Sequence, residues 1–203
     1  ILKIVRTVLS QKKVRKLYFV KTLLALCLVM VPLCAQAKME VFNIDAQRNA
    51  VEHNNRGVIY MQDRYYAPAI KEFQMAVLLD PNTQASSVYY ANLANCYMKI
   101  GYPALAQDTL QRAIKLNPMN FGLYQDLAVV YKRLGIGSQK IKTYKKESEK
   151  NPLAQVMVGM ILMEQGKTDE GLAKLQEFAY TEPDLIITKG VQKYIDEHTK
   201  EKF

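Results

Sequence analysis

The sequence predicts an all-α solenoid in which helix-turn-helix units follow one another and a last helix caps the C-terminal end. Three observations support this prediction: small and aromatic residues recur in a fixed order, apolar residues follow helical spacing, and prolines punctuate the pattern. Pro118 and Pro152 lie 34 residues apart. Each of them is expected to end one unit, because proline cannot continue a helix.

The first two units carry the pattern most completely. In the first unit its members are Gly57, Tyr60, Ala69, Phe73 and Pro81. In the second unit the equivalent members are Ala94, Tyr97, Ala106, Leu110 and Pro118. The small residue of the first helix lets two helix backbones approach closely, and the larger side chains are expected to fill the space between the helices.

The third and fourth units are less regular. The third unit has Ala128 and Tyr131 on its first helix, but its second helix, 139–150, is polar. We therefore expect 139–150 to be the least firmly packed helix. The fourth unit runs to Pro183, and the residues beyond it have the spacing of one more amphipathic helix. Such a helix is what a repeat array needs at its end, because the last repeat otherwise exposes an apolar face.

These residues resemble the tetratricopeptide repeat family across 46–183. The resemblance implies a right-handed superhelical solenoid of helix-turn-helix repeats with a concave groove. We expect about four repeats, at 50–83, 87–120, 121–152 and 153–183, preceded by a segment at 38–45 and followed by a capping helix and tail at 184–203. The opening tryptophan of the family is absent, and His53, Tyr90 and Tyr124 stand at the matching places.

Residues 1–37 have the three parts of a secretory signal peptide. A basic stretch ends at Lys21, an apolar run covers 23–33, and Ala35-Gln36-Ala37 offers small residues to a peptidase. We expect cleavage after Ala37 and an exported protein, either periplasmic or extracellular. The alternative is an uncleaved segment that anchors the chain in the inner membrane, which would be the chain's one membrane contact.

The charge distribution argues against nucleic acid as a partner. The formal net charge is +9, with 28 basic and 19 acidic residues, but seven of the basic residues lie in 1–37. Without them the net charge is about +2, too small for a surface that neutralises a row of phosphates. The chain beyond 37 keeps only Cys96, so no internal disulfide is expected, and the helical pattern around it predicts a buried thiol.

The sequence predicts no enzyme. The chain has two histidines, His53 and His198, and contains no His-Glu-x-x-His pair, no Gly-x-Ser-x-Gly elbow and no glycine-rich phosphate loop. We expect no catalytic residue, no metal, no cofactor and no small-molecule substrate. His53 takes the place of a packing aromatic residue, which indicates a structural role.

The first helix of each unit is expected to contribute a face to the concave groove. In the family, this face binds an extended peptide or a helix of a protein partner. The residues that we expect to bind a partner are Asn54, Val58, Met61, Gln62, Ala91, Asn95, Met98, Lys99, Gln125, Val129, Lys132, Arg133, Met160 and Met163. For each of them the alternative is a solvated inner wall or packing against the terminal helix.

The carboxylate clamp that one subclass of the family uses on chaperone tails is not expected here. Val58, Gly122 and Asp126 stand where that clamp needs other polar or basic groups. The predicted function is that of a non-enzymatic interaction scaffold or adaptor in the cell envelope. The alternative is an accessory or regulatory subunit of an envelope enzyme or of a secretion or pilus assembly machine.

Overall fold

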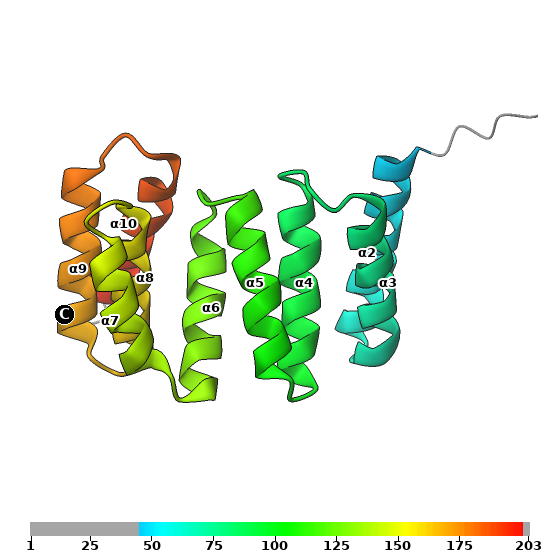
Figure 1. Ribbon diagram of the computed structural model, residues 1–203, viewed down its shortest axis with the longest axis horizontal. Coiled ribbons are helices and arrows are strands. Elements are labelled where there is room, and N and C mark those ends of the chain that lie inside the picture. The colour runs from blue at the N-terminus through cyan, green and yellow to red at the C-terminus, as the bar shows by residue number, and fades with distance from the viewer. Residues whose placement is uncertain (1–44, 201–203) are drawn as a thin grey trace, which may run out of the picture. The chain divides into compact units, whose positions relative to one another are not determined.

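The computed structural model describes residues 45–200, and all regular elements in this range are helices (Figure 1). They are α2 (Ala46–Gln62), α3 (Tyr66–Leu79), α4 (Ser86–Lys99), α5 (Pro103–Leu116), α6 (Phe121–Leu134), α7 (Gly137–Glu147), α8 (Leu153–Glu164), α9 (Thr168–Thr181) and α10 (Ile186–Lys200). The predicted all-α solenoid with a C-terminal capping helix is confirmed. The predicted signal peptide, 1–37, lies outside the described residues.

Short turns with left-handed backbone join the two helices of each unit. After α4, α6 and α8 the turn contains a glycine with positive φ: Gly101, Gly135 and Gly166. After α2 the same conformation is adopted by Arg64, at φ 63°. A side chain in this region costs free energy that glycine avoids. The turn at Arg64 is therefore strained, whereas the glycines of the other units make the same turn without strain.

Close helix approach at Gly57 confirms the predicted role of the small residue in the first unit. A Cβ atom added at Gly57 would lie 2.6 Å from Cε1 of Phe73, so α2 can contact α3 here only without a side chain. Ala94 and Ala128, the equivalents in the next two units, are both buried. The same device recurs between α8 and α9, where a Cβ on Gly159 would lie 2.7 Å from Leu175.

Two tyrosines occupy places where the family has tryptophan, and they tie first helices to the prolines before them. The Tyr124 hydroxyl donates to the Pro118 carbonyl at 2.9 Å, and the Tyr90 hydroxyl donates to the Pro81 carbonyl at 3.4 Å. The expectation that Tyr60 fills the space between helices is wrong, because its side chain is 39% exposed. Tyr60 lies on α2, and no described helix precedes α2 to cover it.

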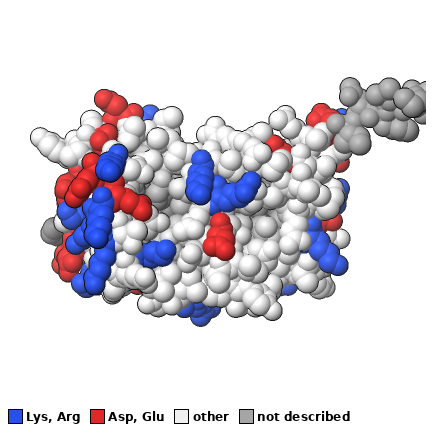
Figure 2. Space-filling model, viewed as in Figure 1, with Lys and Arg blue, Asp and Glu red and all other residues white. Residues whose placement is uncertain are grey.

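The third unit departs from the regular pairing. Helix α7 packs mainly on α8 and only lightly on α6, and Gly137 is its one buried residue. A hydrogen bond of 3.0 Å between the hydroxyls of Tyr131 and Tyr144 still links α6 to α7. Basic side chains line the outer side of α7, which lies at the left of Figure 2. The expectation of a weakly packed polar helix is consistent with this burial.

Helix α8 forms the centre of the C-terminal half. It packs against α6, α7 and α9, and all its residues from Val156 to Leu162 are buried. Helix α10 covers α9 and reaches back to the start of α6. There the Tyr194 ring meets Phe121 edge to face, with the ring centroids 5.5 Å apart. Through Ile187, Val191 and Ile195, α10 joins the main apolar core, which is the role expected of a cap.

Candidate functional site

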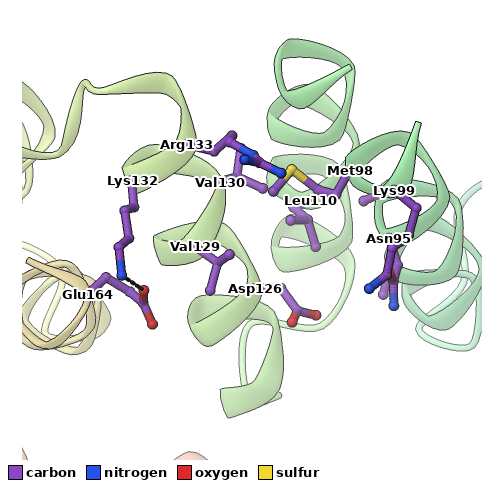
Figure 3. A pocket seen from close by; sticks show the side chains of 12 residues that line it. Asn95, Met98, Lys99, Leu110, Asp126, Val129, Val130, Lys132, Arg133 and Glu164 are labelled. Carbon is purple, nitrogen blue, oxygen red and sulfur yellow. Dashed lines mark hydrogen bonds and ion pairs between the residues drawn. The ribbon is translucent and has the colours of Figure 1, made fainter. Parts of the chain in front are cut away.

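A cleft of about 630 Å³ lies between α4 and α6 (Figure 3). Helix α5 closes its base with Leu110, which is fully buried, and α8 contributes Glu164 at one side. The residues that line the cleft are Ala91, Ala94, Asn95, Met98, Lys99, Leu110, Asp126, Val129, Val130, Lys132, Arg133 and Glu164. They come chiefly from the first helices of the second and third units.

Helical spacing explains why these side chains share one space. On α4, Ala91, Asn95 and Met98 are four and three residues apart, and residues at such intervals lie on one helix face. On α6, Asp126, Val129 and Arg133 repeat this spacing. Since α5 runs back between them, α4 and α6 point in the same direction and end at the same end of the cleft.

The cleft combines apolar and charged groups. Met98 and Val129 supply apolar surface, and the Asn95 amide can both donate and accept hydrogen bonds. Lys132 and Glu164 form an ion pair at 3.1 Å, so their charges cancel locally. Among the described residues, neither Lys99 nor Arg133 nor Asp126 has an ion-pair partner, and their charges are available to a ligand.

Asp126 is reachable by water but lies inside the cleft, with protein around much of it. This desolvation raises the pKa of the Asp126 carboxyl above its ordinary value. The direction of the shift means that the folded protein disfavours the ionised carboxylate. A cationic group placed beside Asp126 would therefore relieve an unfavourable state of the protein.

The structure brings seven of the predicted partner-binding residues together in the cleft. They are Ala91, Asn95, Met98, Lys99, Val129, Lys132 and Arg133. Gln125, on α6, is half-buried and does not line the cleft. All seven belong to the second and third units.

The predicted partner-binding residues of the first unit lie outside the cleft. Asn54 accepts a hydrogen bond from the Asn92 side chain at 2.9 Å, so its oxygen is already used within the fold. Val58 and Met61 pack against the small core around Phe73. Gln62 is exposed at the end of α2 but outside the cleft.

The prediction that Met160 and Met163 line an open groove is wrong. Met160 is 1% exposed and belongs to the main core. Met163 faces α9, because a Cβ on Gly171 would lie 2.8 Å from its sulfur. Helix α8 is enclosed by three other helices, so a face that would be open in a regular array is covered here.

Five residues of the cleft are not among the expected partner-binding residues: Ala94, Leu110, Asp126, Val130 and Glu164. Asp126 could have been found, since it lies three residues before Val129 and seven before Arg133 on the same helix face. Leu110 could not, because it belongs to a second helix and reaches the cleft only through the tertiary packing of α5.

The surroundings of His53 and Cys96 indicate that both side chains have structural roles. His53 Nδ1 lies 2.8 Å from Glu72 Oε2, and Arg56 donates to the same oxygen at 3.0 Å. Burial alone would raise the pKa of Glu72, but the hydrogen bonds from His53 and Arg56 and the Arg56 charge outweigh it and hold that pKa below its ordinary value. Cys96 is buried, and burial raises the pKa of its thiol to about 11.

One part of the chain matches a known protein family. A family model of the tetratricopeptide repeat matches residues 88–120, which span α4 and α5 and include one wall of the cleft. This match supports the resemblance to the tetratricopeptide repeat family. A search of curated protein sequences finds no match.

The solved structures that match this chain include two of MamA. One is 24% identical over 81% of this chain and 86% of that chain, with a TM-score of 0.48. The other is 26% identical over 66% of this chain and 74% of that chain, with a TM-score of 0.45. YrrB, described as a TPR protein with an unusual peptide-binding site, is 19% identical over 71% of this chain and 74% of that chain, with a TM-score of 0.43.

The described residues meet neither the requirements for a membrane span nor those for a metal site. None of the helices in 46–200 has the length and apolar character needed to cross a membrane. Within the same part of the chain, no three side chains of His, Cys, Asp or Glu gather in a way that could hold a metal ion.

Proposed function

We propose that this protein is a scaffold that binds a segment of a protein partner in the cleft between α4 and α6 and acts by binding rather than by catalysis. The observation that carries this proposal is the composition of the cleft: an apolar floor and walls, with three charged side chains that have no partner among the described residues. Helical repeat proteins commonly use such concave surfaces for recognition.

The cleft offers each kind of contact that a peptide needs. The Met98 side chain is flexible and fits apolar groups of different shapes, while Val129 adds a rigid apolar surface beside it. Asn95 can bond both an N–H and a carbonyl of a peptide backbone. Since these groups are carried by helices that pack on a common core, the cleft needs little ordering when a partner binds.

Filling the cleft tests this proposal. Val129 is 42% exposed, so Val129→Tyr can place a ring in the cleft without disturbing the core. The control is Val51→Tyr, the same substitution on α2 at a side chain that is 46% exposed and outside the cleft.

Affinity capture with both variants should show proteins that wild type and Val51→Tyr retain and that Val129→Tyr loses, with all three chains equally helical by circular dichroism. Retention of every captured protein by Val129→Tyr would contradict the proposal.

We further propose that the protein acts in the cell envelope after export. The basic stretch, the apolar run and the small-residue site of 1–37 support this proposal. Mass spectrometry of the protein from cell fractions is the test. A mature chain that begins at Lys38 in the periplasm or medium is expected, and a full-length chain in the membrane fraction would favour the anchored alternative.

A further inference from the structure

We infer that the cleft selects a bipolar segment, one that carries an acidic and a basic side chain about 10 Å apart with an apolar residue between them. This inference rests on the proposed binding function and adds the chemistry of the partner. The placement of the unpaired charges along α4 and α6 supports it.

Arg133 places a positive charge at one end of the cleft, and Lys99 places another on the facing wall. Lys99 is the last residue of α4, and Arg133 is the last but one of α6. The two helices run in the same direction and finish at the same end of the cleft, where Arg133 stands, while the Lys99 side chain turns back along α4 toward Asn95 (Figure 3). The guanidinium of Arg133 can hold a carboxylate with two parallel hydrogen bonds, and Lys99 adds positive potential from the facing wall.

The unpaired negative charge lies further back along the same helix. Asp126 and Arg133 are seven residues apart on α6, a distance of about 10 Å along the axis at 1.5 Å per residue. Val129 lies between the two charged positions along α6, and Met98 adds apolar surface from the facing wall beside Arg133 (Figure 3). The ion pair of Lys132 with Glu164 contributes no net charge. A ligand that matches this surface must therefore change the sign of its charge along its length.

An extended segment fits this spacing better than a helix does. In a polyproline II conformation, side chains three residues apart lie on one side of the chain and about 9 Å apart. A helical partner would need seven residues to span the same distance and is about 10 Å wide. The cleft, at about 630 Å³, has the size of a site for a few residues. Three residues is therefore the expected separation of the two charges in the partner.

Short peptides with capped ends test the inference, since capping removes the terminal charges. The bipolar peptide is acetyl-Gly-Glu-Leu-Ala-Lys-Gly-amide, and its controls replace the lysine by glutamate or the glutamate by lysine. Binding is followed by nuclear magnetic resonance titration of the protein with each peptide at low salt. The bipolar peptide is expected to bind about three to ten times more tightly than either control, as is usual for one or two partly solvated ion pairs.

Charge reversal in the protein supplies the decisive comparison. Asp126→Lys should weaken binding of the bipolar peptide and strengthen binding of the peptide with two glutamates, so that the preference is inverted. The matched control is Asp108→Lys, the same change at an exposed residue of α5 outside the cleft, which should leave the order of affinities unchanged.

The two proposals fail in different ways. Equal binding of all three peptides, abolished by Val129→Tyr, would overturn the bipolar inference and leave the binding function standing. Binding of the bipolar peptide that Val129→Tyr does not reduce, or no shift of cleft resonances with any peptide at millimolar concentration, would overturn the bipolar inference, while the binding function itself falls only if Val129→Tyr retains every captured protein.

Discussion

Replacing Gly57 by alanine tests the packing of the first helix pair. The added Cβ atom would lie 2.6, 2.8 and 2.9 Å from three atoms of the Phe73 ring, where about 3.5 to 4 Å is the ordinary separation of carbon atoms. Phe73 is fully buried, so its ring cannot swing out into water. Overpacking of this kind costs about 1 to 3 kcal/mol, and three short contacts indicate the upper part of that range.

Alanine also favours the helix over glycine, by about 1 kcal/mol, and this offsets part of the cost. The net loss of unfolding free energy expected for Gly57→Ala is therefore about 1 to 2 kcal/mol. For an array of this length, each kcal/mol lowers the melting temperature by about 2 to 4 °C. Thermal unfolding followed by circular dichroism should show a fall of that size.

Two further variants make the result specific. Asn55→Ala, an exposed change on the same helix, should not lower the melting temperature, because alanine is the better helix former. Phe73→Leu removes part of the ring that meets the added Cβ, so the double variant should lose less stability than the two single variants together. A melting temperature of Gly57→Ala at or above wild type, without such coupling, would show that Gly57 does not face Phe73.

Three other predictions concern single residues. Arg64→Gly should raise the unfolding free energy by about 0.5 to 1 kcal/mol, because glycine adopts positive φ without strain, and a lower melting temperature would contradict this account. The Cys96 thiol should stay unreactive toward a disulfide reagent at pH 8 until urea unfolds the chain, because its pKa is raised to about 11 by burial; rapid labelling of the native protein would refute its burial. Asp126→Asn should stabilise the protein at neutral pH, since the raised pKa of Asp126 shows that its ionised form is disfavoured in the folded state. The gain should disappear as the pH falls below the ordinary pKa of 3.8, where both folded and unfolded wild type carry the neutral acid, and a gain that persists there in urea titrations would refute the electrostatic explanation.

The repeating residues predict the helix pairs because each of them has a local or near-local cause. Gly57 with Phe73, and the prolines that end the second helices, belong to contacts between neighbours in the sequence. Such contacts repeat from unit to unit, so a pattern reveals them. The turn at Arg64 shows the limit of this reasoning, because its positive φ is imposed by the fold at a residue that does not favour it.

The cleft could be predicted only in part. Spacing along α4 and α6 selects Asn95, Val129 and Arg133, because those helices follow the regular repeat. It fails for Met160, since the surroundings of α8 are determined by how α7 and α9 pack around it. It also fails for Asn54, whose hydrogen bond to Asn92 joins two units and has no signature in either one.

The central claim is that a partner segment lies against α4 and α6, and site-specific photo-crosslinking tests it most directly. A photoreactive phenylalanine analogue at Asn95, on the cleft wall, is compared with the same group at Gln176, an exposed residue of α9 outside the cleft. We expect irradiation in cells to join the Asn95 variant to one partner protein, at a peptide that carries opposite charges three residues apart. Crosslinks that form from Gln176 while Asn95 gives none would contradict the assignment of the cleft as the binding site.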